Sequence, residues 1–271
     1  MDNLRVVDDE AGTNWFRLGV IAVALIAVIA LGIEGYAWYQ REHAPPAPIA
    51  EAPPAPAAAP AVATDEAPVH PVEVVRPPVA LTRENGDAEL YSELARLTGS
   101  ETVARWIRPA ELVRHFVATV DALPRRQVPQ QVLPTTPVPG RLVVVPSAGG
   151  TVLGAENAKR YQPWVHLLLS IDPATAASAY RRFYPLFQQA YRDLGYPKGY
   201  FNDRLIEAID DALEAPEPAA PPRVESPAVM WRFVDPDLES LSAGQKVLLR
   251  LGPVPGKAVR AWLKDFRAKV A

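Results

Sequence analysis

The chain has 271 residues, of which 49% are hydrophobic by type and 22% are charged, and its formal net charge is −3. This length allows one or two domains with a packed core, and the near-neutral charge gives no reason to expect a nucleic-acid partner. The absence of cysteine excludes disulfides, thiolate catalysis and cysteine-ligated metals. The 30 prolines, roughly double the usual share, indicate that part of the chain is not globular.

The first element in chain order is an apolar segment, WFRLGVIAVALIAVIALGIEGYAWYQR. Its uncharged stretch and flanking aromatic residues are typical of a helix that spans a bilayer core of roughly 30 Å. The leader is net acidic and no small-x-small cleavage site follows, so a retained single-pass anchor over residues 15–39 is favoured over a cleaved signal peptide. A slight excess of arginine before the span places residues 1–14 in the cytoplasm and the remainder in the periplasm of a bacterium, with the inner membrane between them.

Residues 40–80 are dominated by alanine and proline and show no apolar periodicity. Proline removes amide donors and favours polyproline II, so this segment is predicted to be a disordered, semi-rigid linker with a reach on the order of 100 Å. We expect a plain tether; the alternative is a PxxP ligand.

A folded domain is expected over residues 81–271, and it is predicted to be mostly α with one small β-hairpin. Helices are expected over DAELYSELARLTG, SETVARWI and PAELVRHFVATVDAL, the last with Pro109 and Glu111 in its first turn. Residues 124–140 are proline-rich and expected to be extended. RLVVVPSAGGTVL is typical of a hairpin that turns at two glycines, and AVMWRFV is a possible strand.

Two consecutive helices carry most of the candidate chemistry. The first places Tyr180, Phe183, Tyr184, Phe187 and Tyr191 on one face, which predicts an aromatic core stripe; the alternative is a cleft that stacks sugars or peptide side chains. Pro185 should kink this helix. The second places four carboxylates on the face opposite its apolar stripe, which favours a solvated acidic face over acid–base catalysis or a cation site: Asp203, Glu207, Asp210 and Glu214.

The C-terminal region predicts two further helices. Ser242 and Gln245 have the spacing of a capping box, and a Gly-Pro pair ends that helix. The last helix has a basic side and an apolar face formed by Val259, Trp262, Leu263, Phe266 and Val270. We expect that face to dock onto the domain, with the acidic helix as a possible partner for the basic side; the alternative is a helix that lies on an anionic membrane.

Motifs for catalysis or cofactor binding are missing from the sequence, which contains no HExxH, GxSxG, Walker-type or GxGxxG pattern. His166 is expected to be a hydrogen-bonded core residue and not a catalytic base. No catalytic, cofactor-binding or metal residue is therefore assigned, no cofactor is expected, and a non-enzymatic role is favoured.

The stretch LGYPKGYFNDRL, residues 194–205, is predicted to be a corner between two helices of an αα-hairpin. Gly195 is placed at a left-handed cap, and Gly199 lets the chain turn. Asn202 is expected to be the N-cap of the next helix, with Phe201 and Ile206 as a hydrophobic staple.

Four residues of this stretch have no helix-boundary role, namely Tyr196, Lys198, Tyr200 and Arg204. They form the candidate ligand or partner surface.

Three segments together resemble a bacterial family catalogued as domain of unknown function 3014: ARWIRPAELVRHFVATVDAL, RRFYPLFQQAYRDLGYPKGYFNDRLIEAIDDAL and LSAGQKVLLRLGP. The resemblance covers roughly residues 85–270. It implies a membrane-anchored bacterial protein with a helical extracytoplasmic domain, and it carries over no catalytic or binding residue.

Two functions follow from the sequence. The favoured one is a non-enzymatic binding or scaffolding module of the cell envelope, anchored in the lipid bilayer by residues 15–39 and bound to an envelope protein partner. The alternative is a module that binds or hydrolyses peptidoglycan or another glycan through its tyrosine-rich segment.

Overall fold

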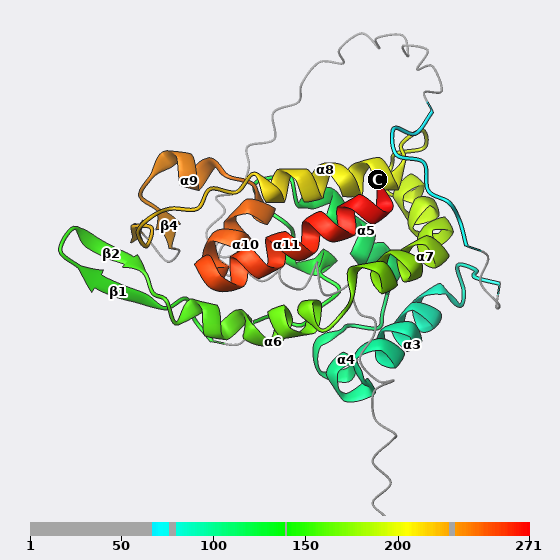
Figure 1. Cartoon of the computed structure of the whole chain (residues 1–271), viewed down its shortest axis with the longest axis horizontal. Helices are drawn as coiled ribbons and strands as arrows, with labels where there is room; N and C mark the ends of the chain where they lie inside the picture. Colours follow the sequence, from blue (N-terminus) through cyan, green and yellow to red (C-terminus); the bar gives the residue numbers. More distant parts are fainter. Residues whose placement is uncertain (1–66, 76–79, 139, 228–230) are drawn as a thin grey trace, which may run out of the picture.

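The computed structural model describes residues 67–75, 80–138, 140–227 and 231–271. Within them nine helices pack into one body with a small β-region at one end, so the expectation of a mostly α domain with a hairpin is confirmed (Figure 1). The helices are α3 (Gly86–Thr98), α4 (Ser100–Trp106), α5 (Leu112–Ala122), α6 (Asn157–Leu169), α7 (Pro173–Asp193), α8 (Phe201–Leu213), α9 (Pro236–Ser240), α10 (Ala243–Leu251) and α11 (Pro253–Val270).

The expected cytoplasmic tail, membrane anchor and most of the linker, residues 1–66, lie outside the described residues. Among the described residues, no helix combines the length and the apolarity that a bilayer span requires.

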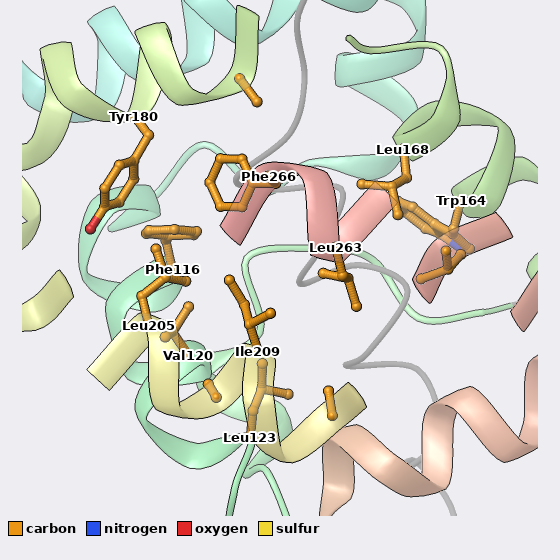
Figure 2. Close-up of a cluster of buried hydrophobic side chains, with 14 of the residues drawn as sticks. Phe116, Val120, Leu123, Trp164, Leu168, Tyr180, Leu205, Ile209, Leu263 and Phe266 are labelled. Atoms are coloured by element: carbon orange, nitrogen blue, oxygen red, sulfur yellow. The ribbon is translucent and has the colours of Figure 1, made fainter. Parts of the chain in front are cut away.

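The core lies between α5, α7, α8 and α11, with α6 extending it at one side. Figure 2 shows the buried side chains that these helices contribute: Phe116, Val120, Leu123, Trp164, Leu168, Tyr180, Leu205, Ile209, Leu263 and Phe266. The aromatic residues of α5 and α7 are in direct contact, since the ring centroids of Phe116 and Phe187 are 4.6 Å apart. Burial of such rings supplies the main part of the driving force for folding.

The aromatic stripe of α7 is confirmed as core. Tyr180, Phe183, Phe187 and Tyr191 are buried, while Tyr184 is half-buried and donates a hydrogen bond to Gln188. The Asp172 carboxylate caps the first turn of α7, and the helix runs without interruption through Pro185.

The β-region consists of two antiparallel pairs. β1 (Val144–Ser147) pairs with β2 (Gly150–Leu153), and β3 (Val224–Glu225) pairs with β4 (Arg232–Phe233), as the sequence predicts for the hairpin and in part for the later strand. The turn of the hairpin requires Gly150, whose φ is 120°. Buried Asn157 holds the base of the hairpin, because its amide bonds the main chain of Val143 and Gly154.

The start of α5 differs from the prediction. Pro109 lies before the helix, and Glu111 is the N-cap residue with a left-handed φ of 50°, so neither occupies the first turn. The cause is non-local: Arg108 donates its N–H to the Pro134 carbonyl and thereby stays in an extended pairing, while the Asp87 carboxylate of α3 accepts the Val113 N–H.

His166 also differs from the prediction, because it is exposed. The buried positions of α6 include Tyr161, Trp164, Val165 and Leu168, which have the i, i+3, i+4, i+7 spacing of one helix face. His166 falls on the other side of the helix.

The C-terminal helices follow the prediction. Ser242 and Gln245 form the capping box of α10, which ends at Gly252. The apolar face of α11 is buried against its own domain, where the Trp262 indole donates a hydrogen bond to the Ile171 carbonyl at 2.8 Å.

Candidate functional site

The stretch from residue 194 to residue 205 is the corner between α7 and α8, as predicted, and both helices pack against α5 and α11. Gly195 has a φ of 108°, which confirms its left-handed cap. The chain turns at Gly199 as expected, since the Gly199 N–H donates to the Tyr196 carbonyl at 3.1 Å. The position is also tightly packed: a Cβ there would lie 2.9 Å from Cε1 of Tyr191 and 3.2 Å from Cβ of Tyr196. The corner therefore packs directly on the aromatic stripe of α7.

Tyr196 and Arg204, two of the four predicted residues, meet at Asp121 of α5. The Arg204 Nε donates to Asp121 Oδ1 at 3.1 Å, and the Tyr196 hydroxyl donates to Asp121 Oδ2 at 3.3 Å. The Arg125 guanidinium also bonds Asp121 Oδ2 and donates to the Tyr196 hydroxyl oxygen at 2.9 Å. We call Asp121, Arg125, Tyr196 and Arg204 the Asp121 network.

The electrostatics of the Asp121 network match its enclosed position. Burial alone would lower the pKa of Arg204, but its hydrogen bond to Glu207 and the charges of Glu207 and Asp121 raise that pKa above the usual value. Burial, with the Asp121 charge as a second cause, raises the pKa of Tyr191 to about 12. Arg204 is thus held permanently charged, and Tyr191 stays neutral at physiological pH.

The other two predicted residues lie outside the Asp121 network. Lys198 is exposed, and Tyr200 is half-buried at the N-cap position of α8. The Tyr196 ring stacks on Tyr191 with 4.5 Å between centroids and an interplanar angle of 17°. One face of the Tyr196 ring is therefore covered within the domain.

Asn202 is not the N-cap of α8, since the helix begins at Phe201, and Phe201 and Ile206 do not have the positions of a staple. The Asn202 side chain is fully buried and bonds three partners from distant parts of the chain. It accepts from the Tyr180 hydroxyl at 2.9 Å and donates to the His70 and Val270 carbonyls at 2.9 and 2.7 Å.

The next residue, Asp203, continues this arrangement. Its two carboxylate oxygens accept the N–H groups of Val69 and His70 at 3.1 and 2.7 Å. Together Asn202 and Asp203, which we call the clamp, hold a segment that the sequence assigns to the linker. No local pattern could have predicted this, because the partners are more than 130 positions away.

The acidic face of α8 is largely solvated, as the sequence predicts, since Glu207 and Glu214 are exposed and Asp203 and Asp210 are half-buried, but three of its carboxylates also have partners. Asp203 belongs to the clamp, Glu207 pairs with Arg204 at 2.7 Å, and Asp210 pairs with Arg267 of α11 at 2.7 Å. Glu214 is exposed. The expected pairing of this helix with the basic side of the last helix is thus present at Asp210.

Across the described ranges, no three acidic or histidine side chains gather in a way that could hold a metal ion. The corner instead contains charge pairs and amide contacts between distant segments. This arrangement defines a mostly helical domain in which the start of α8 joins residues 69–70 to Val270 at the end of α11.

The chain belongs to the family described as Protein of unknown function (DUF3014), whose model matches residues 112–267. The resemblance proposed from the sequence is thereby confirmed. The match begins with α5 and ends in α11, so it includes the Asp121 network and the clamp but not α3, α4 or the segment bound by the clamp. No curated protein and no solved structure matches the chain.

Proposed function

We propose that this protein is a non-enzymatic binding or scaffolding module of the bacterial cell envelope. In this proposal residues 15–39 anchor it in the inner membrane, the proline-rich segment carries the domain away from the bilayer, and the helical domain works in the periplasm on an envelope protein. The layout supports this role, because a semi-rigid spacer is useful to a module whose partner lies at a distance from the membrane.

The proposal that the protein is not an enzyme is based on the Asp121 network. General acid–base catalysis needs two titratable groups with separated pKa values that both reach a substrate. In the corner, Asp121 is instead enclosed by Arg125, Arg204 and Tyr196, so its carboxylate contributes to the fold. Two of the four candidate residues of the corner, Tyr196 and Arg204, are thus bound to Asp121.

The glycan alternative is less well supported by the geometry. Sugar binding by aromatic stacking needs an open ring face, whereas Tyr180 and Tyr191 are buried and Tyr196 stacks on Tyr191. Co-sedimentation of the purified full chain with cell-wall sacculi tests this alternative. Co-sedimentation that is lost on Tyr196→Ala but retained on Tyr91→Ala, a change at a tyrosine of α3 that is likewise half-buried, would favour glycan binding over our proposal.

Site-specific photo-crosslinking in intact cells tests the binding proposal. A photo-reactive residue at exposed Lys198 is compared with one at exposed Lys159 of α6, which lies away from the corner (Figure 1). We expect a discrete crosslinked product containing one envelope protein from position 198 and none from position 159. Equal, diffuse labelling from both positions would contradict a specific partner at the corner.

The proposed topology has its own test. In spheroplasts, external protease should degrade the helical domain while a tag fused before residue 1 stays protected. Protection of the domain in intact spheroplasts, with cleavage only after lysis, would overturn the periplasmic placement.

A further inference from the structure

Residues 67–75, which we call the strap, lie against the domain although the sequence assigns them to the linker. The strap, the C-terminal end of α11 and the N-terminal end of α8 meet at one corner (Figure 1). The three hydrogen bonds that join strap and clamp involve only main-chain groups of the strap: the N–H of Val69 and the N–H and C=O of His70. A contact of this kind recognises an extended peptide backbone and requires no particular side chain.

The clamp is held in place independently of the strap. Apart from the strap, Asn202 is bonded to Tyr180 of α7 and to the Val270 carbonyl at the end of α11. Asp203 lies in the first turn of α8, where the helix dipole stabilises a carboxylate. The site is therefore preorganised for an extended segment, which lowers the cost of binding one.

The strap itself is lightly held. Val69 is 76% exposed, and Val74 and Val75 are about half exposed. Val72 is the strap residue that packs against the main core. Segments with few buried apolar contacts open at a free energy well below that of global unfolding.

From these observations we infer that the clamp is a binding site for an extended peptide segment of the envelope partner, and that the strap occupies this site in cis. The inference rests on the proposed binding function and specifies its site and ligand class. The partner's backbone would donate two successive N–H groups to Asp203 and offer a carbonyl to Asn202, as Val69 and His70 do. An empty clamp would leave the buried Asn202 amide with an unsatisfied donor, so exchange of one peptide for another is favoured over simple opening.

Displacement of the strap also changes how far the domain reaches. Residues 67–75 would join the linker and extend it by roughly 30 Å at about 3.1 Å per residue. Partner binding at the clamp would therefore be coupled to a longer tether.

The chain contains no cysteine, so a spin label on a single Val69→Cys variant of the full-length protein reports the state of the strap. The probe is a synthetic peptide of residues 67–75, APVHPVEVV. The control peptide has the same sequence with N-methyl groups on the amides that correspond to Val69 and His70, which removes both donors to Asp203. When no peptide is added, the label should be immobile in the protein with an intact clamp. In an Asp203→Ala variant the label should be mobile even without peptide.

We expect the unmodified peptide to mobilise about half of the label at a concentration on the order of 1–10 mM, the effective concentration of a short cis tether. The N-methylated peptide should leave the label immobile. If the label stays immobile at saturating peptide while Asp203→Ala releases it, the strap is a permanent part of the fold and the inference is wrong. Dipolar broadening between labels that grows with protein concentration would show that the clamp binds the strap of a second copy of the chain, and the inference would then be wrong. Neither outcome alters the crosslinking result at position 198, so failure of the proposed function is detected separately.

Discussion

Two neighbouring contacts on the first turn of α8 differ in what they bind. Arg204 faces Asp121 of α5 and binds it through a side-chain ion pair closed by Arg125 and Tyr196. Asp203, the preceding residue, binds two main-chain N–H groups of the strap. The partner of Arg204 is fixed on a core helix, whereas the partner of Asp203 is an extended segment with little buried surface.

The difference separates a contact that stabilises the domain from one that is available for exchange. Removing one partner of an enclosed ion pair leaves the other charge without compensation, which costs several kcal/mol. Releasing the strap opens the Asp203 carboxylate to water and removes one acceptor from the Asn202 amide, which another peptide backbone can replace. Consecutive residues on one helix therefore serve the fold and the proposed binding site separately.

The largest effect is expected for Asn202→Ala, because Asn202 bonds both the core of the domain and the strap. The substitution removes the acceptor of the buried Tyr180 hydroxyl and the donor to the His70 and Val270 carbonyls. We expect a loss of about 3 to 4 kcal/mol in the free energy of unfolding, measured by urea denaturation. A loss below about 1 kcal/mol would mean that Asn202 does not join these segments in solution.

Arg204→Ala should lower the free energy of unfolding by about 2 to 3 kcal/mol. Asp121 would still contact Arg125 and Tyr196, but it would no longer be paired with the most enclosed cation of the Asp121 network. A double-mutant cycle with Asp121→Ala isolates the pair, and we expect a coupling energy above about 1 kcal/mol. Additive effects of the two substitutions would show that the Asp121 network does not fix α8 to α5.

Gly199→Ala tests the packing of the corner without changing a charge. The added Cβ would lie 2.9 Å from the Tyr191 ring, which is itself stacked on Tyr196, so the rings must shift. We expect a loss of about 1 to 2 kcal/mol in unfolding free energy, with Gly195→Ala as a comparison in which backbone strain and not contact is the cause. A neutral Gly199→Ala variant would contradict the tight corner.

Asp203→Asn should have the smallest effect on global stability, less than about 1 kcal/mol, because the contacts it weakens belong to the lightly held strap. Limited proteolysis should nevertheless cut the strap faster in this variant than in the unmodified protein. Glu207→Gln, a neighbouring carboxylate on α8 that does not contact the strap, is the matched control and should leave strap cleavage unchanged. Equal cleavage in all three proteins would disprove the role of the clamp.

The parts of the fold that depend on local sequence were predictable. Apolar spacing placed the core faces of α7 and α11, the capping box placed the start of α10, and Gly195 marked the end of α7. Each of these signals acts within a few residues along the chain.

The clamp was not predictable, because residue type alone suggested the wrong role for Asn202. Asparagine before a helix is a common N-cap, but here the helix begins one residue earlier and the amide is committed to Tyr180, His70 and Val270. The start of α5 was misplaced for a similar reason, since Arg108 is held extended by the Pro134 carbonyl. In both places distant hydrogen bonds override a local preference.

Hydrogen exchange at the His70 amide tests the central claim most directly, because this N–H donates to Asp203 only while the strap is bound. We predict that the His70 amide is protected from exchange, and that the free energy of the opening that exposes it lies well below the opening free energy of the core amides of α8. In Asp203→Ala this protection should be lost. Exchange of His70 with the same free energy as the α8 core would show that the strap is locked into the fold and would contradict the account.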